Sequence, residues 1–136
     1  MKISGADIAR LVKFGIVGAS GVIVNQTVLV FATKYLNIDY KISSLAAIET
    51  AVISNFLLNY NWTWKDRKKE TAKDAAVALL KFNATSFFTA FCLNWTILVF
   101  LTEVAGVKYY WSNLAGIFAA AGFNFLASNF WVFRKN

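Results

Sequence analysis

The sequence predicts an all-α integral membrane protein with four transmembrane helices, built from two tandem helical hairpins of the same topology. Of its 136 residues, 58% are hydrophobic and only 15% are charged, whereas about 25% of the residues of a soluble domain are charged. The apolar residues also fall into four blocks, each long enough to cross a hydrocarbon core of about 30 Å. We expect such spans and their loops to leave no room for a soluble domain.

The four predicted spans are residues 12–33, 42–62, 79–101 and 111–133. A backbone in lipid must satisfy its own hydrogen bonds, and uninterrupted apolar runs without Pro do so as helices. The first span is rich in Gly, which favours close contact between helices in a membrane. It has polar residues and lacks a small-residue cleavage site, so we expect a retained helix and not a signal peptide.

Basic residues predict the orientation of the spans. Eleven of the fourteen Lys and Arg residues fall on one side of the four spans. By the positive-inside rule that side is cytoplasmic, so we expect a multi-pass protein of the cell membrane with both termini in the cytoplasm. Trp62, Trp64 and Trp131 are expected to anchor this side at the membrane interface. The eleven residues are Lys2, Arg10, Lys13, Lys65, Arg67, Lys68, Lys69, Lys73, Lys81, Arg134 and Lys135.

The composition excludes several classes of function. The chain has no His, and its single cysteine, Cys92, has no partner for a CxxC motif or an intrachain disulfide. Zinc sites and His-based catalytic triads are therefore excluded, and we expect no metal, no cofactor and no catalytic residue. The net charge of +7 follows from membrane topology, so we expect no nucleic-acid partner.

The chain contains an internal repeat, with copies at about 11–65 and 79–135. Each copy opens with Lys-Phe. A matching segment of polar and apolar residues follows, which lies one residue later in the second copy than in the first. Each copy closes with an Asn-Phe-Leu segment that ends in aromatic and basic residues. Each copy leaves and returns to one side, so the halves share a topology. The matched segments are 13–14 with 81–82, 25–31 with 94–100, and 55–65 with 124–134.

Polar residues recur on one face of the second and fourth spans. At about 100° per residue, Asn55, Asn59 and Trp62 share a face of the second span. Their repeat counterparts Asn124, Ser128 and Trp131 share the equivalent face of the fourth. The two stripes indicate either hydrogen bonds between helices, worth about 0.6–2 kcal/mol each, or a hydrophilic groove for a polar ligand group. The residues alone favour the first interpretation.

Three charged residues near or within the spans are further candidates. Glu49 is the one acidic residue well inside a predicted span, so it is protonated, paired or facing water. Proton coupling, contact with a sugar hydroxyl and a structural hydrogen bond all remain open for it. Lys13 and Lys81 lie at the cytoplasmic ends of their spans. They either snorkel to lipid headgroups or contact the phosphate of a lipid substrate.

The segment Lys-Phe-Gly-Ile-Val-Gly at 13–18, together with the two Asn-Phe-Leu endings, resembles the GtrA-like family of small four-helix membrane proteins. The resemblance covers nearly the whole chain and implies a single GtrA-like transmembrane domain over 1–136. It implies a role in cell-surface polysaccharide or teichoic-acid glycosylation, in which the family is thought to move polyprenyl-phosphate-linked monosaccharides to the outer leaflet. Related four-helix segments also occur fused to or beside glycosyltransferases of the dolichol-phosphate-mannose-synthase type.

The resemblance favours the groove over the structural interpretation of the polar stripes. A sugar that enters the bilayer needs replacement hydrogen bonds, which Asn side chains supply as donors and acceptors. Family members often place Arg where this chain has Tyr60 and Asn129, so the phosphate is expected at the lysines instead. The expected substrate-binding residues are Lys13, Lys81, Asn55, Asn59, Asn124 and Glu49.

The expected partners are the lipid-linked sugar, membrane lipids, a glycosyltransferase and a second copy of the chain. No ATP-binding loop is present in the sequence, so transport is expected to run down a gradient or to draw on another partner. The main alternative is a non-transporting membrane anchor or scaffold that recruits a glycosyltransferase through the basic loop 65–74. A proton-coupled exporter that uses Glu49 is a third possibility.

Overall fold

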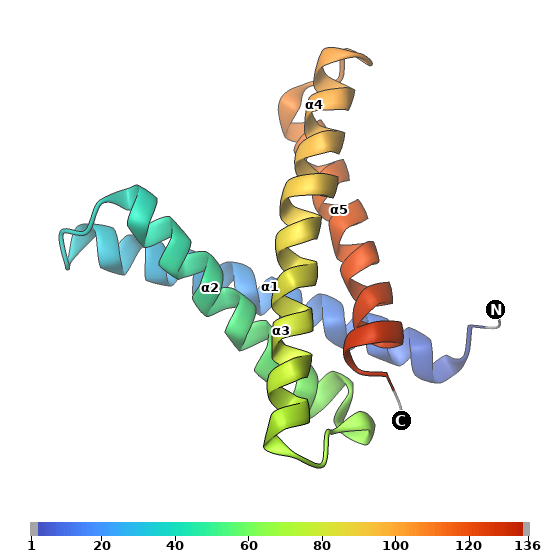
Figure 1. Ribbon diagram of the computed structural model, residues 1–136. Helices are drawn as coiled ribbons and strands as arrows, with labels where there is room; N and C mark the ends of the chain where they lie inside the picture. The colour runs from blue at the N-terminus through green and yellow to red at the C-terminus, as the bar shows by residue number, and fades with distance from the viewer. Residues whose placement is uncertain (1–2, 135–136) are drawn as a thin grey trace. The chain divides into compact units, whose positions relative to one another are not determined.

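The structure, a computed structural model, describes residues 3–134, and the side chains of 90, 91, 109, 110 and 113 stand outside that description. Lys2 and Lys135, which enter the charge count, also lie outside it. The chain forms two compact units, Met1–Glu70 and Thr71–Asn136, called here the first and the second hairpin (Figure 1).

Four helical segments of the described chain are long and apolar enough to cross a membrane. Every regular element between residues 3 and 134 is helical, so the predicted fold class is confirmed. The boundaries expected for the two repeats, 11–65 and 79–135, stay a prediction. The four segments are Gly5–Lys34, Tyr40–Thr63, Ala72–Glu103 and Leu114–Val132.

The first hairpin pairs α1 (Gly5–Lys34) with α2 (Tyr40–Leu58), which run side by side (Figure 1). A π-helical turn, η1 (Asn59–Thr63), extends α2, and the short 3-10 helix η2 (Lys65–Arg67) follows. Helix α1 begins seven residues before the predicted span because Ser4 caps it. The Asp7 backbone N–H donates to Ser4 Oγ at 3.2 Å, and the Ser4 N–H donates to the Asp7 carboxylate at 3.0 Å.

The second hairpin contains α3 (Ala72–Phe88), the π-helical turn η3 (Thr89–Asn94) and α4 (Trp95–Glu103) as one continuous helical run. This run lies along α5 (Tyr109–Ala127), which the π-helical turn η4 (Ser128–Val132) extends (Figure 1). The sequence predicted an uninterrupted third helix. The turn η3 interrupts it because the second copy has one residue more than the first at this point, and an i→i+5 turn takes up one residue more than an α turn.

The turns that join the helices of each hairpin have the same geometry. Asn37 in the first turn and Gly106 in the second have positive φ values of 53° and 71°, a conformation that Gly adopts freely and Asn tolerates. After each turn a buried serine hydroxyl donates to the backbone, from Ser43 at 3.3 Å and from Ser112 at 3.5 Å. The two hairpins are therefore copies in their turns as well as in their helices.

The core of each hairpin includes an aromatic pair at the basic end. Trp64 is fully buried and packs edge-to-face on Phe14, with ring centroids 5.9 Å apart. In the second hairpin Phe133 is fully buried beside Phe82, at 6.3 Å. The prediction that Trp64 anchors the membrane interface is therefore wrong, because this ring fills the helix contact.

Candidate functional site

Each hairpin holds a lysine over a tryptophan that comes from another helical element. In the first hairpin Lys13 Nζ lies 5.5 Å from the centroid of the Trp62 ring. In the second, Lys81 Nζ lies 5.3 Å from the centroid of the Trp131 ring. These two contacts, called here the Lys–Trp pairs, join α1 to η1 and α3 to η4. The repeat therefore gives each hairpin the same cation–π contact.

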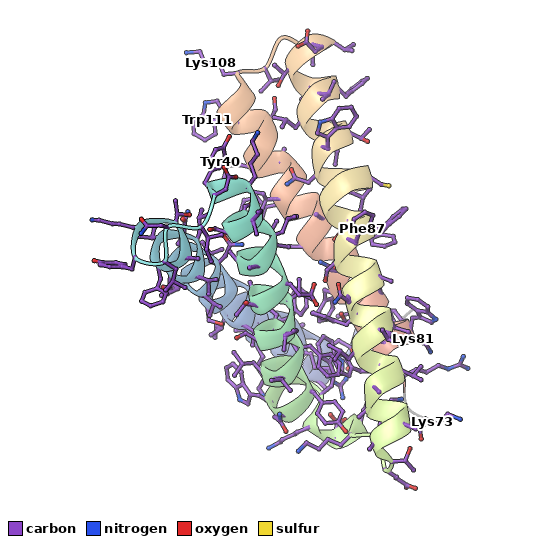
Figure 2. All side chains as sticks on the ribbon, turned by 60° about the vertical axis from the view of Figure 1, so that its left-hand side comes forward. Tyr40, Lys73, Lys81, Phe87, Lys108 and Trp111 are labelled. Carbon is purple, nitrogen blue, oxygen red and sulfur yellow. The ribbon has the colours of Figure 1, made fainter. Side chains whose placement is uncertain are left out.

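The Lys–Trp pair of the second hairpin lies toward its basic end. Figure 2 shows Lys81 and Lys73 toward one end of this hairpin, and Lys108 and Trp111 at the other. The sequence predicts that the end with Lys73 faces the cytoplasm. Lys81 thus lies toward the end of the hairpin for which the sequence predicts a cytoplasmic location.

The π-helical turns explain how a tryptophan becomes available to each lysine. The Trp64 N–H donates to the Asn59 carbonyl oxygen at 2.8 Å, and the Phe133 N–H donates to the Ser128 carbonyl oxygen, also at 2.8 Å. Each bond spans five residues, so each turn is wider than an α turn. The aromatic residue at the end of each turn, Trp64 or Phe133, is buried. The tryptophan within each turn is exposed instead, Trp62 by 40% and Trp131 by 49%.

The polar stripe of the first hairpin lies deeper than its Lys–Trp pair. Asn59 is only 1% exposed, and its Oδ1 accepts a hydrogen bond from Thr63 Oγ1 at 2.8 Å. Asn55 lies against Gly21 of α1, where a Cβ atom would come within 2.7 Å of Asn55 Nδ2. Asn55 Oδ1 is buried and accepts no hydrogen bond from the described part of the chain.

The second hairpin repeats this arrangement in part. Asn124 Oδ1 and Ser128 Oγ, the counterparts of the first stripe, are buried and have no hydrogen-bond partner among residues 3–134. Asn94 Oδ1 is a third such atom, and Asn94 lies against Gly116 of α5. An unsatisfied buried polar atom costs about 1–3 kcal/mol. A ligand hydroxyl that donates to these oxygens would remove that cost.

Glu49 lies apart from the polar stripe. Its side chain is exposed on α2, whereas Asn55 lies against α1. Its repeat counterpart Phe118 is exposed on α5. The structure therefore brings Lys13 to Trp62, and Glu49 lies on the exposed surface of α2.

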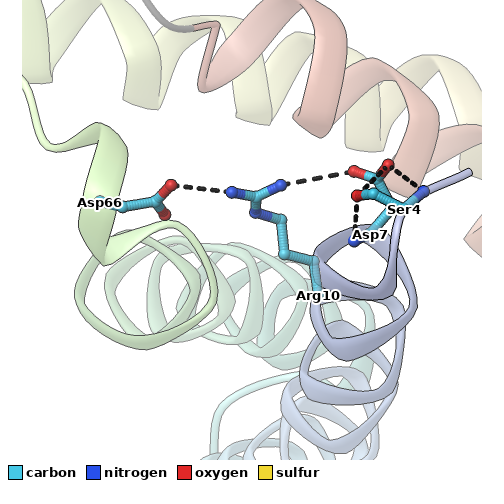
Figure 3. Close-up of polar contacts among 4 residues, drawn as sticks. All are labelled: Ser4, Asp7, Arg10 and Asp66. Carbon is cyan, nitrogen blue, oxygen red and sulfur yellow. Dashed lines mark hydrogen bonds and ion pairs between the residues drawn. The ribbon is translucent and has the colours of Figure 1, made fainter.

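An ion-pair cluster closes the basic end of the first hairpin (Figure 3). Arg10 donates to Asp66 at 2.7 Å and to Asp7 at 3.4 Å. Partial burial raises the pKa of Asp66, but a backbone hydrogen bond and the charges of Arg10 and Arg67 outweigh it, so the pKa is lowered overall. The Arg10–Asp66 contact was not predicted from the sequence, because the two residues lie 56 positions apart.

The sequence placed Trp62 and Trp131 on the faces of the polar stripes and at the membrane interface, but it did not identify them as binding residues. In both copies the tryptophan lies two positions before another aromatic residue, Trp64 or Phe133. This repeated spacing could have indicated a shared role for the two tryptophans. The lysines and asparagines were identified, but only the structure shows which of their atoms lack partners.

Comparison with known proteins agrees with the four-helix membrane fold. The family model described as "GtrA/DPMS, transmembrane domain" matches residues 13–135. A relative from Pyrococcus furiosus, named dolichol-phosphate mannosyltransferase, is 36% identical over 123 residues, which are 88% of this chain and 32% of the relative. The chain thus spans about a third of the length of this relative. Because the family match extends over nearly all of its length, the chain belongs to the GtrA/DPMS transmembrane-domain family.

Proposed function

We propose that this protein moves a polyprenyl-phosphate-linked monosaccharide from the cytoplasmic to the outer leaflet of the cell membrane, for the glycosylation of cell-surface polysaccharide or teichoic acid. Its family relates the chain to polyprenyl-phosphate sugar metabolism. Both termini lie in the cytoplasm in this proposal, as the basic residues predict. The chain itself forms and breaks no glycosidic bond.

The observation that supports transport most directly is the matched pair of buried amide oxygens, Asn55 Oδ1 and Asn124 Oδ1, which lack partners among the described residues. A sugar that leaves water loses hydrogen bonds worth a few kcal/mol per polar group. In either hairpin a sugar hydroxyl would donate to the asparagine oxygen of that hairpin, and the free energy gained there offsets part of that loss.

The other expected residues take supporting roles in this proposal. Lys13 and Lys81 attract the phosphate at the basic ends of the hairpins. Asn59 is nearly buried and bonded to Thr63, so it fixes the turn that carries Trp62. Glu49, exposed on α2, accepts hydrogen bonds from sugar hydroxyls outside the stripe. Because four helices enclose little space, two copies of the chain share the path.

Transport is tested with purified protein in liposomes that contain a polyprenyl-phosphate mannose with a short tail. We expect the wild-type protein to accelerate its crossing, and Asn55→Ala and Asn124→Ala to slow it about tenfold each, since one lost hydrogen bond is worth roughly 1–1.5 kcal/mol. Crossing is measured by the accessibility of the sugar to a lectin added outside.

A matched control comes from the same helical segment. Asn61 is exposed, and its Nδ2 donates to the Leu57 carbonyl oxygen at 2.8 Å. Asn61→Ala removes an amide of the same size without touching the proposed path, so we expect its transport rate to match that of the wild type. Normal crossing in folded Asn55→Ala and Asn124→Ala proteins would rule out the path.

A second function, a non-transporting anchor for a glycosyltransferase, has its own support. The named relative is a mannosyltransferase about three times as long as the matched segment. The basic loop after α2 is also held in place. Tyr60 Oη accepts from the Lys69 N–H at 3.0 Å and donates to the Lys69 carbonyl oxygen at 3.2 Å, and Lys68 Nζ lies 5.6 Å from the centroid of the Tyr60 ring. An ordered basic loop suits an acidic protein surface.

The anchor function predicts a different sensitivity to mutation. Charge reversal of Arg67, Lys68 and Lys69 to Glu should release a co-expressed polyprenyl-phosphate glycosyltransferase from the purified complex, and Asn55→Ala should not. The readout is co-purification in detergent. An enzyme that stays bound after the reversal would count against this function.

A further inference from the structure

We infer that Trp62 and Trp131 bind sugar, and that each Lys–Trp pair is one composite site for a hexosyl phosphate headgroup. The ammonium takes the phosphate, and the indole takes one face of the sugar ring. The inference rests on the proposed function for its substrate class. It assigns the sugar to two aromatic residues in addition to the asparagines.

The Lys–Trp pairs join residues farther apart in sequence than the other cation–π contacts of the described chain, of which the most distant is that of Lys68 with Tyr60. Lys34 lies over Tyr35 at 5.8 Å, and Lys41 lies over Tyr40 at 6.0 Å. Both of those contacts join neighbours in sequence, so chain connectivity alone brings them together. The Lys–Trp pairs instead join residues about fifty positions apart, and they recur in both hairpins. Helix packing, and not local connectivity, creates them.

The two lysines carry charge that the described chain does not neutralise. Neither Lys13 nor Lys81 makes an ion pair with a carboxylate among residues 3–134. Arg10, by contrast, bonds to both Asp7 and Asp66. A lysine gains at least as much from an anionic lipid surface as from an exposed cation–π contact. A lipid phosphate can therefore draw each ammonium away from its ring.

That displacement leaves an indole face ready for a sugar. The rings of Trp62 and Trp131 are about half exposed. The face of an aromatic ring carries negative potential, and the C–H bonds of one face of a pyranose are weakly positive. Phosphate and sugar are covalent neighbours in a hexosyl phosphate, as the ammonium and the indole are spatial neighbours in the pair. The site thus binds both the phosphate and the sugar of one headgroup. In the first hairpin the headgroup would meet this site before Asn55, which lies about 10 Å farther along the helix.

The test separates sugar binding from phosphate binding. The dissociation constants of polyprenyl-phosphate mannose and of the unglycosylated polyprenyl phosphate, with tails of equal length, are measured on protein in detergent micelles. In a protein with Trp62→Leu and Trp131→Leu we expect binding of the mannosyl lipid to weaken about tenfold and that of the bare phosphate to stay unchanged. Lys13→Gln with Lys81→Gln should weaken both.

Two further variants make the result decisive. Trp111→Leu, at the other end of the second hairpin (Figure 2), should leave both constants unchanged. Trp62→Phe with Trp131→Phe keeps a smaller ring, so it should give an intermediate, sugar-selective loss, and it serves if the Leu variant does not fold. An equal loss for both lipids, or no loss for either, would overturn the inference.

Failure of this inference is distinguishable from failure of the proposed function. A wild-type protein that prefers the mannosyl lipid but does not accelerate its crossing would contradict transport and leave the composite site standing. A protein that transports normally, but whose tryptophan variants show no sugar-selective loss, would contradict the composite site alone.

Discussion

In each hairpin one glycine lets the two helices approach closely at an asparagine, Gly21 at Asn55 and Gly116 at Asn94. A Cβ atom on Gly116 would lie 2.8 Å from the Asn94 carbonyl oxygen and 3.2 Å from its Cα. Because a helix backbone cannot give way as a side chain can, we expect Gly116→Ala to lower the free energy of unfolding by roughly 1–3 kcal/mol. Gly122→Ala, which meets no heavy atom within 4 Å, is the control. Unfolding of both proteins in mixed micelles checks this, and equal stability would contradict the close contact.

The carboxylate of Asp66 gives the first hairpin a dependence on pH. Its pKa lies below its ordinary value of 3.8 in the folded protein, so the folded state binds fewer protons than the unfolded state. Its contribution is therefore present above the ordinary pKa and disappears as the pH falls through the lowered value. We expect Asp66→Asn to reduce stability by up to about 1 kcal/mol at neutral pH.

The comparison is made by measuring unfolding in detergent from about pH 6 to pH 3, and the difference between wild type and Asp66→Asn should shrink toward the acid end. Glu70→Gln alters an exposed carboxylate that makes no ion pair within the described chain, and it should change little. A difference that grows on acidification would contradict the role of the Arg10–Asp66 contact.

At the level of elements, the π-helical turn η3 makes the third segment tolerant of a deletion. Removing Cys92, which is exposed in this turn, should convert an i→i+5 turn into an α turn without rotating the flanking helices. Removing Val24 from the α helix α1 should rotate one flank by about 100° and disrupt the packing of α1 on α2, including the contact of Lys13 with Trp62. We expect the Cys92 deletion to stay folded by size-exclusion chromatography and the Val24 deletion to aggregate. The opposite order would show that η3 does not absorb the extra residue.

The elements also show what the sequence could and could not predict. Apolar blocks and the repeat predicted four helices and the matched asparagines, because membrane spans are set by composition and length. The start of α1 at a capping box, the burial of Trp64 and the π-helical turns were not predicted. They depend on hydrogen bonds and packing between particular atoms, which a pattern of polar and apolar residues does not record. Among the site residues, the sequence identified Asn55 but could not show that its Oδ1 lacks a partner.

In the molecule as a whole, the two hairpins are copies that differ in the side chains at some matched positions. Both carry a Lys–Trp pair and a buried asparagine oxygen without a partner among the described residues. Only the first has an acidic side chain at the position of Glu49, where the second has Phe118, and Arg10 of the first corresponds to Ala78 of the second. Shared features are those that a headgroup would meet in either hairpin. Arg10, which is found in the first hairpin alone, stabilises that hairpin through its ion pairs. Glu49 offers an acidic contact in the first hairpin that the second lacks.

Orientation in the membrane decides the direction in which such a protein would act. The basic residues predict that the Lys–Trp pairs lie toward the cytoplasm, the side from which the proposed substrate starts. In a Cys92→Ser background, a membrane-impermeant maleimide should label Leu36→Cys, in the turn between α1 and α2, in intact cells. It should label Lys68→Cys, in the loop after α2, only after the cells are permeabilised. Both positions are exposed, so burial does not limit either reaction. Labelling of Lys68→Cys in intact cells would place the Lys–Trp pairs toward the outer surface and contradict the proposed direction of transport.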